Sequence, residues 1–268
     1  MNKSGLALAV LALFATLAHA EDYLSPTEER VRLSLGVVHL SNNTDFQIDS
    51  SAGVPGTPVN AENQFGLDKT DYQAKIQAMV RAGERHRLWF DYFSLDRSGQ
   101  TTVTDPIVFR DVVLQPGDPL LSDLSIRTFS LTYGYSFLHG DKYEVAATIG
   151  IADTDISARA RVQTAARHVD QTEDQAGPVP MLGLNATYVI SKRFYVDGRA
   201  QYLKVRIDDL DGTLGIYELD ALYRLRPNIS FALGYTAFRA NLISNQAKQA
   251  GFFNFNSKGP EFFLRVAF

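Results

Sequence analysis

The segment Ser125–Phe137, SIRTFSLTYGYSF, alternates between apolar and polar residues along most of its length. Successive side chains of a β-strand point to opposite faces, so this period of two predicts a strand. One predicted face carries large apolar side chains: Phe129, Leu131, Tyr133, Tyr135 and Phe137. The other carries small or polar residues: Thr128, Ser130, Thr132, Gly134 and Ser136. A soluble sheet does not line its solvent-facing side with aromatic rings, so the pattern indicates a strand with one face toward lipid.

The same alternation predicts ten strands, at about 30–41, 71–82, 86–96, 124–138, 142–153, 179–191, 193–206, 214–226, 228–240 and 259–268. Short connections at 83–86, 138–141, 191–192 and 226–228 alternate with mostly long ones at 42–70, 97–123, 154–178, 207–213 and 241–258. Transmembrane barrels have this asymmetry, with short periplasmic turns and long extracellular loops. We therefore predict an all-β fold, a transmembrane antiparallel up-and-down β-barrel of ten strands. Eight strands would require two of these segments to be loops, and twelve would require a hairpin inside the long loops.

The first 20 residues have the pattern of a secretory signal peptide. Lys3 precedes the apolar run LALAVLALFATL, and AHA at 18–20 offers small residues for cleavage. This run is shorter than the roughly 20 residues that a spanning helix needs. We therefore divide the chain into a signal peptide, 1–20, and one barrel domain, 21–268. Cysteine is absent, so the exported protein has no disulfide framework.

The chain ends in EFFLRVAF, with Phe262, Leu264, Val266 and Phe268 at spacings of two. This segment resembles the C-terminal strand of Gram-negative outer-membrane β-barrel proteins, a class that includes small barrels of the OmpA and OmpW kind. The resemblance implies a place in the bacterial outer membrane, among its lipids and lipopolysaccharide. It also implies that these four residues are recognised by the barrel-assembly machinery. The net charge of −4 gives no reason to expect a nucleic-acid partner.

The inward faces of the predicted strands carry a balanced set of charges. The basic members are Arg32, Lys75, Arg81, Arg199, Arg224 and Arg265. The acidic members are Asp91, Glu144, Asp197, Glu218, Asp220 and Glu261. An unpaired charge inside the barrel would be costly, so this balance indicates ion pairs that bridge and occlude the lumen. A pore selective for one sign of ion would favour an excess of one charge, although a narrow conduit remains an alternative.

The stretch VVHLSNN, 37–43, places His39 and Ser41 on the outward face at the outer end of the first strand. This arrangement resembles the His-x-Ser-Asn stretch of outer-membrane phospholipase A and lipid A deacylase. By that resemblance His39 would be the base and Ser41 the nucleophile of an ester hydrolase. The sequence departs from both families at Asn43, where they have a small residue. It also has Gly53 and Val54 at the distance where they have an orienting Asn or Glu.

Ten strands with tall loops also resemble the omptin proteases, which use acidic residues and a histidine above the membrane. Here ADTD at 152–155, DDLDG at 208–212 and His168 would supply such groups. The sequence contains no phosphate-binding loop, no G-x-S-x-G motif and no spaced metal-ligand cluster. We therefore expect no cofactor and no metal.

These observations predict a non-catalytic outer-membrane barrel with a structural or surface-binding role and an occluded lumen. One alternative is a narrow channel for small solutes. The other is an outer-leaflet lipid hydrolase that uses His39 and Ser41. Recognition by such a scaffold would fall to its loops, whose ligand the sequence does not name.

Overall fold

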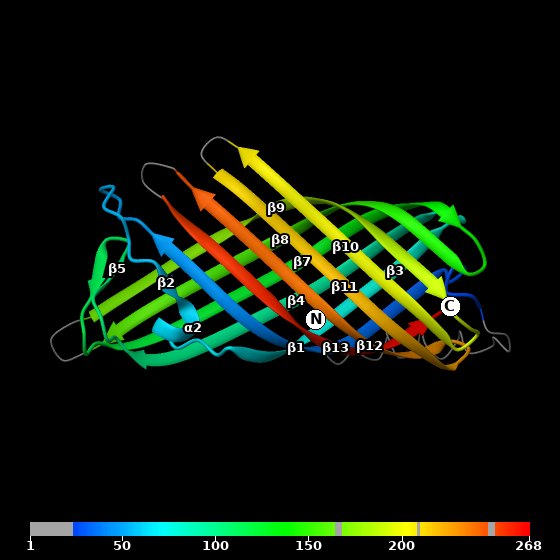
Figure 1. Cartoon of the computed structure of the whole chain (residues 1–268), viewed down its shortest axis with the longest axis horizontal. Helices are drawn as coiled ribbons and strands as arrows, with labels where there is room; N and C mark the ends of the chain where they lie inside the picture. The colour runs from blue at the N-terminus through cyan, green and yellow to red at the C-terminus, as the bar shows by residue number, and fades with distance from the viewer. Residues whose placement is uncertain (1–23, 164–167, 208–209, 246–249) are drawn as a thin grey trace, which may run out of the picture.

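In the computed structural model, the chain is described for residues 24–163, 168–207, 210–245 and 250–268. Ten long strands form one barrel (Figure 1): β1 (Val31–Ile48), β3 (Thr70–Ala82), β4 (His86–Thr102), β7 (Pro119–His139), β8 (Tyr143–Gln163), β9 (His168–Val189), β10 (Phe194–Ile207), β11 (Leu210–Arg226), β12 (Ile229–Ser244) and β13 (Gly251–Ala267). This fold confirms the predicted all-β barrel of ten strands. The signal peptide predicted at 1–20 lies outside the described residues.

Each long strand pairs antiparallel with the next, and β13 pairs with β1 to close the barrel. The closing register runs from Arg32 opposite Ala267 to Ile48 opposite Gly251. Beside the first residues of β1, the Arg30 N–H donates to the Phe268 carbonyl at 2.6 Å, and the Phe268 N–H donates to the Val31 carbonyl at 2.9 Å. We call this pairing the seam. It closes the ring of ten strands, within which β9 and β10 pair with each other only over residues 182–189 and 195–202.

The two ends of the barrel differ. One end holds the C-terminus and four short connections, and we call it the turn end; the opposite end we call the loop end (Figure 1). Short elements lie at the loop end: β2 (Val59–Asn60), α2 (Ala61–Gln64), β5 (Ile107–Phe109) and β6 (Val112–Leu114). No helix in the described part of the chain is long and apolar enough to cross a bilayer.

The strands extend farther toward the loop end than the sequence pattern predicted. The segment 154–178 was predicted to be a long loop, but β8 continues to Gln163 and β9 begins at His168. Parts of the predicted loops 97–123 and 241–258 are likewise strand. Of the long connections, 49–69 and 103–118 remain as loops that carry only short elements.

The reason is an inversion of polarity along the strands. Near the turn end of β8, Ile149 and Ile151 point outward and are 58% and 47% exposed. Nearer the loop end, polar residues such as Ser157 and Arg159 take the outward positions, while Ile156 and Ala158 face the lumen. Lipid requires apolar outward side chains and water does not, so this reversal of the alternation is what a barrel that rises above a bilayer would show.

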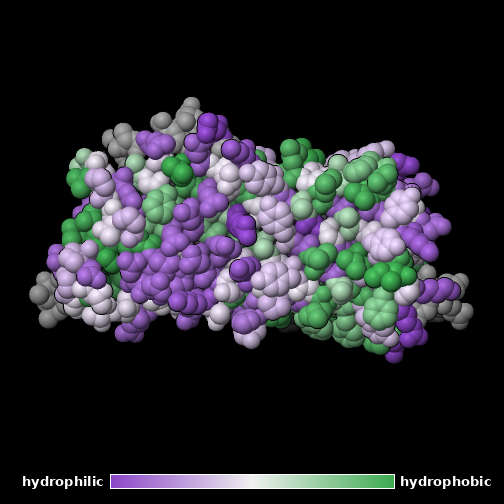
Figure 2. All heavy atoms as spheres, in the orientation of Figure 1, coloured by the Kyte–Doolittle hydropathy of each residue, from purple (hydrophilic) through white to green (hydrophobic). Residues whose placement is uncertain are grey.

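The outer surface shows the same division. Large exposed apolar and aromatic residues lie on every long strand near the turn end, among them Val37, Tyr72, Leu182, Leu219 and Leu233. Figure 2 shows them as a green and pale region over the half that holds the turn end, whereas the loop-end half is mostly purple. We call this region the apolar belt. A contiguous surface of this kind is typical of contact with lipid.

Candidate functional site

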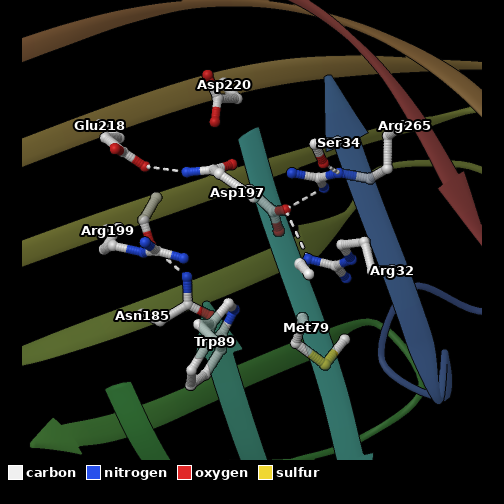
Figure 3. Close-up of a pocket in the computed structure, with 13 residues that line it drawn as sticks. Arg32, Ser34, Met79, Trp89, Asn185, Asp197, Arg199, Glu218, Asp220 and Arg265 are labelled. Carbon is white, nitrogen blue, oxygen red and sulfur yellow. Dashed lines mark hydrogen bonds and ion pairs between the residues drawn. The ribbon is translucent and has the colours of Figure 1, made fainter. Parts of the chain in front are cut away.

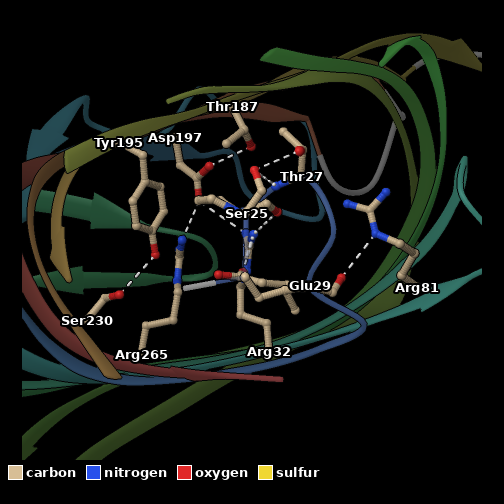
Figure 4. Close-up of polar contacts among 12 residues, drawn as sticks. Ser25, Thr27, Glu29, Arg32, Arg81, Thr187, Tyr195, Asp197, Ser230 and Arg265 are labelled. Carbon is tan, nitrogen blue, oxygen red and sulfur yellow. Dashed lines mark hydrogen bonds and ion pairs between the residues drawn. The ribbon is translucent and has the colours of Figure 1, made fainter. Parts of the chain in front are cut away.

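The turn end of the lumen is closed by the chain's own N-terminal segment. Residues 24–30 enter the barrel, where Thr27 and Glu29 are only 1% and 3% exposed. Figure 4 shows this segment inside the ring of strands, with Glu29 beside Arg32. Arg224 donates to the Leu24 carbonyl at 2.6 Å and to Glu29 at 3.2 Å. These contacts hold the segment as a plug.

Glu144 on β8 is the centre of one buried ion cluster. Its side chain is fully buried and accepts two hydrogen bonds from Arg81, both at 2.8 Å. Arg87 on β4 lies 3.2 Å from the same carboxylate, and the Ser136 hydroxyl donates to it at 2.5 Å. Arg87 also lies over the Trp89 ring, 4.9 Å from its centroid. Two guanidinium groups therefore share one carboxylate in a site closed to water.

Asp197 on β10 is the centre of a second cluster (Figures 3 and 4). It accepts hydrogen bonds from Arg32 at 3.1 Å, from the Thr187 hydroxyl at 2.6 Å, and from Arg265. Arg265 in turn donates to the Ser34 hydroxyl at 3.2 Å. The cluster ties β1, β9, β10 and β13 together across the lumen.

The two clusters form two layers of ion pairs, and a third layer, which we call the Lys75 layer, lies nearer the middle of the barrel. Lys75 on β3 donates to Glu218 at 2.7 Å and to Glu261 at 2.8 Å, which joins opposite walls. Arg199 donates to Asp91 at 2.9 Å. Together the three layers leave a cavity of only about 20 Å³ among these residues, close to the space of one water molecule. The half of the lumen nearer the turn end, which we call the lower lumen, is therefore filled.

The structure brings together all twelve charged residues that the sequence placed in the lumen, and eleven of them form ion pairs. The twelfth, Asp220, is 5% exposed, and it forms no ion pair with any described residue. Sequence reasoning missed Glu29 and Arg87. Glu29 precedes the first predicted strand, and Arg87 lies on the segment 86–96, where aromatic residues on both faces obscure the alternation.

The half of the lumen nearer the loop end, which we call the upper lumen, is lined mainly by apolar rather than charged side chains. One apolar cluster extends across it, with Val38, Leu95, Leu124, Ile126 and Phe255 among its buried members. Above the Lys75 layer lies a cavity of about 90 Å³ with an apolar roof and a charged floor. Nearer the loop end lies a second cavity of about 220 Å³, which we call the upper cavity. The apolar cluster contributes residues to the walls of both cavities.

The upper cavity is lined by large apolar side chains and by a few small ones. The large ones include Phe46, Phe65, Phe109, Leu124, Ile156 and Phe253. The small ones are Ala61, Ala158 and Ala160. Phe46, Phe65 and Phe109 contact one another at ring-centroid distances of 5.3 to 5.9 Å. The walls of the upper cavity therefore combine an aromatic group with small side chains.

Residues 49–69 and 103–118 together cover the upper cavity, and we call them the lid. Val59, Phe65, Val103, Ile107 and Leu114 of the lid pack with Leu120 and Val162 of the barrel in one buried cluster. The two parts of the lid are also joined by Ser51, whose N–H and hydroxyl both donate to Asp111, at 2.8 and 2.9 Å. These two hydrogen bonds hold the pKa of the Asp111 carboxyl below its usual value.

An ion pair anchors the lid to the barrel wall. Arg97 on β4 donates to Glu62 of α2 at 2.7 Å, and both side chains are almost fully buried. Glu62 also accepts from the Thr44 N–H and hydroxyl, at 2.8 and 2.9 Å. Beside this pair the lid passes so close to β4 that a Cβ on Gly99 would lie 2.2 Å from the Gly66 carbonyl oxygen. Sequence reasoning missed this anchor because both partners fall in segments predicted to be loops.

His39 and Ser41 lie on the outward face of β1, near the upper edge of the apolar belt, where the sequence placed them. The His39 ring stacks on Tyr72 with a centroid distance of 4.5 Å. In the described part of the chain, no hydrogen bond joins His39 to Ser41 or to a carboxylate. Asp71, the nearest acidic residue on the neighbouring strand, faces the other way and accepts from Gln73.

Replacement of Ser41 by alanine tests whether this pair acts on esters. We expect the refolded wild type and Ser41→Ala to hydrolyse phospholipid and lipid A no faster than buffer without protein, because His39 is stacked on Tyr72 and no third group among the described residues orients it. Released fatty acid would be measured for both proteins, after each has been shown to be folded. Turnover by the wild type that disappears with Ser41→Ala would instead identify a hydrolase.

The remaining predicted residues lie apart from the lumen. Asp153 and Asp155 are exposed on the outer face of β8, while 208–209 and the side chain of His168 lie outside the described residues. Phe262 and Leu264 point outward on β13, 53% and 38% exposed; Val266 lies in the same strand, and Phe268 directly follows its last residue at the turn end. No group of His, Asp or Glu residues suited to a metal ion occurs among the residues that the structure describes.

Comparison with known proteins identifies the class of proteins that share this fold. No family model matches the chain, and no curated protein matches it. Among solved structures, the outer membrane protease OmpT from Escherichia coli is similar at a TM-score of 0.56 and 12% identity, over 92% of this chain and 99% of that chain. The transport unit of the autotransporter AIDA-I from Escherichia coli gives 0.47 and 8% identity, over 97% of each chain.

The closed ten-stranded barrel, with its apolar belt and short turns at one end, is a transmembrane-type β-barrel. Within that type, the chain has the fold of the bacterial outer-membrane β-barrel proteins, as its C-terminal strand indicated. At 12% identity the similarity to OmpT is one of fold and says nothing about proteolysis.

Proposed function

We propose that this protein is an integral outer-membrane barrel that conducts no ions and acts by binding at its loop end. The apolar belt would lie in the bilayer, with the turn end in the periplasm and the loop end outside the cell. This orientation follows the usual arrangement of short turns and long loops in outer-membrane barrels. The polar outward residues of the extended strands, such as Asp155 and Arg159, suit water above the membrane.

The observation that carries this proposal is the filled lower lumen. The described lower lumen holds seven basic residues, the six predicted ones with Arg87, and seven acidic residues, the six predicted ones with Glu29. Their ion pairs leave about 20 Å³ of free space. A conducting pore needs a continuous path that ions can enter and leave. The paired layers and the N-terminal plug provide none.

A planar bilayer recording tests this directly. We expect the refolded wild type to produce no discrete current steps, because a permeating ion would have to break several buried ion pairs. A porin inserted from the same detergent serves as the positive control. Current steps in the wild type would contradict the proposal, and steps whose ion selectivity changes in Glu218→Gln would assign a narrow channel through the Lys75 layer.

A further inference from the structure

The upper cavity is an unusual feature in a protein interior. Interiors are packed about as densely as organic crystals, with few voids larger than a water molecule. An apolar cavity of about 150 Å³ already stays dry and takes up benzene or xenon. The upper cavity is larger, at about 220 Å³, and its walls are almost wholly apolar.

One buried polar group in this cavity lacks a partner. Ser122 on β7 lines the cavity and is 3% exposed, and its hydroxyl forms no hydrogen bond with any described residue. The other hydroxyl in the wall, that of Thr44, is already bonded to Glu62 at 2.9 Å and to Arg97 at 3.1 Å. A buried hydroxyl without a partner is costly, so Ser122 offers one hydrogen bond to a molecule inside the cavity.

The charged groups nearby are already occupied by others. Asp123 and Arg159 border the cavity from the outward face of β7 and β8, where Arg161 donates to Asp123 at 2.8 Å and Arg159 pairs with Asp170. Glu62 is likewise neutralised by Arg97. An ionic ligand would therefore lose its hydration in the cavity and gain no counter-charge, which excludes salts and zwitterions as the preferred class.

We propose that the upper cavity binds one small, uncharged hydrophobic molecule, larger than benzene, that carries a single hydrogen-bonding group for Ser122. Two-ring aromatic alcohols and aliphatic alcohols of similar size belong to this class. Phe46, Phe65 and Phe109, three of the five phenylalanines of the wall, supply ring faces and edges for an aromatic ligand. The lid closes over the ligand, and its Arg97–Glu62 anchor sets how readily the cavity opens. The inference deepens the proposed function, because it names the class of molecule that the loop end would bind.

The test uses 1-naphthol, a fluorescent two-ring compound with one hydroxyl group, and the full-length barrel in lipid nanodiscs. Titration of empty nanodiscs measures partition into lipid and is subtracted. We expect saturable binding of one molecule per barrel. Ala158→Phe places a phenyl ring in the cavity and should weaken binding at least tenfold. Ser157→Phe is the matched control, since the neighbouring side chain is on the outward face and should leave binding unchanged.

Ser122→Ala separates the hydrogen bond from the shape of the cavity. It should weaken binding of 1-naphthol by about fivefold to tenfold and leave binding of naphthalene unchanged. If Ala158→Phe does not fold, Ala61→Leu fills the cavity from the lid instead. Two results would overturn the inference: no saturable binding above empty nanodiscs, or equal binding by the wild type and the filled variants.

The two proposals fail in different ways. A barrel that conducts ions but binds 1-naphthol in this cavity would contradict the proposed sealed lumen and support the binding site. A silent barrel without saturable binding would contradict the binding site alone.

Discussion

Replacement of Glu144 by glutamine is expected to destabilise the barrel by about 3–5 kcal/mol, because it leaves two buried guanidinium groups without a carboxylate. Arg81 and Arg87 both contact Glu144, and all three side chains are at most 3% exposed. The neutral amide keeps the shape of the side chain, so the loss would come from charge rather than from packing. Urea unfolding in lipid vesicles, followed by the fluorescence of Trp89, measures the free energy of unfolding.

Two further variants test the cause of this loss. In the Glu144→Gln background, Arg87→Met removes one uncompensated charge and should recover part of the lost stability. Asp211→Asn breaks the exposed pair with Arg206 and should change stability little, because exposed ion pairs contribute little. Wild-type stability in Glu144→Gln, or a further loss on adding Arg87→Met, would show that the cluster is not held by its charges.

Replacement of Arg97 by methionine is expected to release the lid while the barrel stays folded. Glu62 would remain as a buried carboxylate without a cation, and the Asp68 carbonyl would lose its donors from Arg97. Breaking a buried pair costs about 3 kcal/mol or more, which corresponds to a roughly 100-fold larger open population. Limited proteolysis should therefore cut within 49–69 about 100-fold faster, since cleavage follows the open population when opening is rapid.

The matched control for the lid is Arg161→Met. It removes an arginine of the loop end whose pair with Asp123 is half exposed, at 39% and 47%. We expect its cleavage rate to equal that of the wild type. Equal rates in Arg97→Met and Arg161→Met would show that packing of the lid, rather than the Arg97–Glu62 pair, keeps it closed.

The sequence predicted best the part of the fold that lipid constrains. On β7 the bilayer requires outward rings at Phe129, Tyr133 and Tyr135, and this requirement is visible in the alternation. Water imposes no such demand on Ser157 or Arg159, so the continuation of β8 resembled a loop. The strand pattern therefore located the membrane-facing half and missed the rise of the barrel above it.

The same limit applies to the interior. Alternation placed Lys75 and Glu218 inside the barrel, but their contact joins residues 143 positions apart and follows only from closure of the sheet. Arg97 and Glu62 looked like solvated loop residues, because nothing local shows that a lid folds back over the lumen. The upper cavity likewise depends on residues from strands and lid together, such as Phe46, Phe109 and Ala158.

The seam between β1 and β13 has a consequence for how the barrel forms. Ser34 and Arg265, hydrogen-bonded across it, are 231 positions apart, so the ring cannot close until the last residues of the chain are present. Every intermediate sheet exposes two unpaired edges, each a template for pairing with another chain. Contacts between residues so far apart in the sequence form slowly. Protection of the first strand until the last arrives is therefore a requirement set by the topology itself.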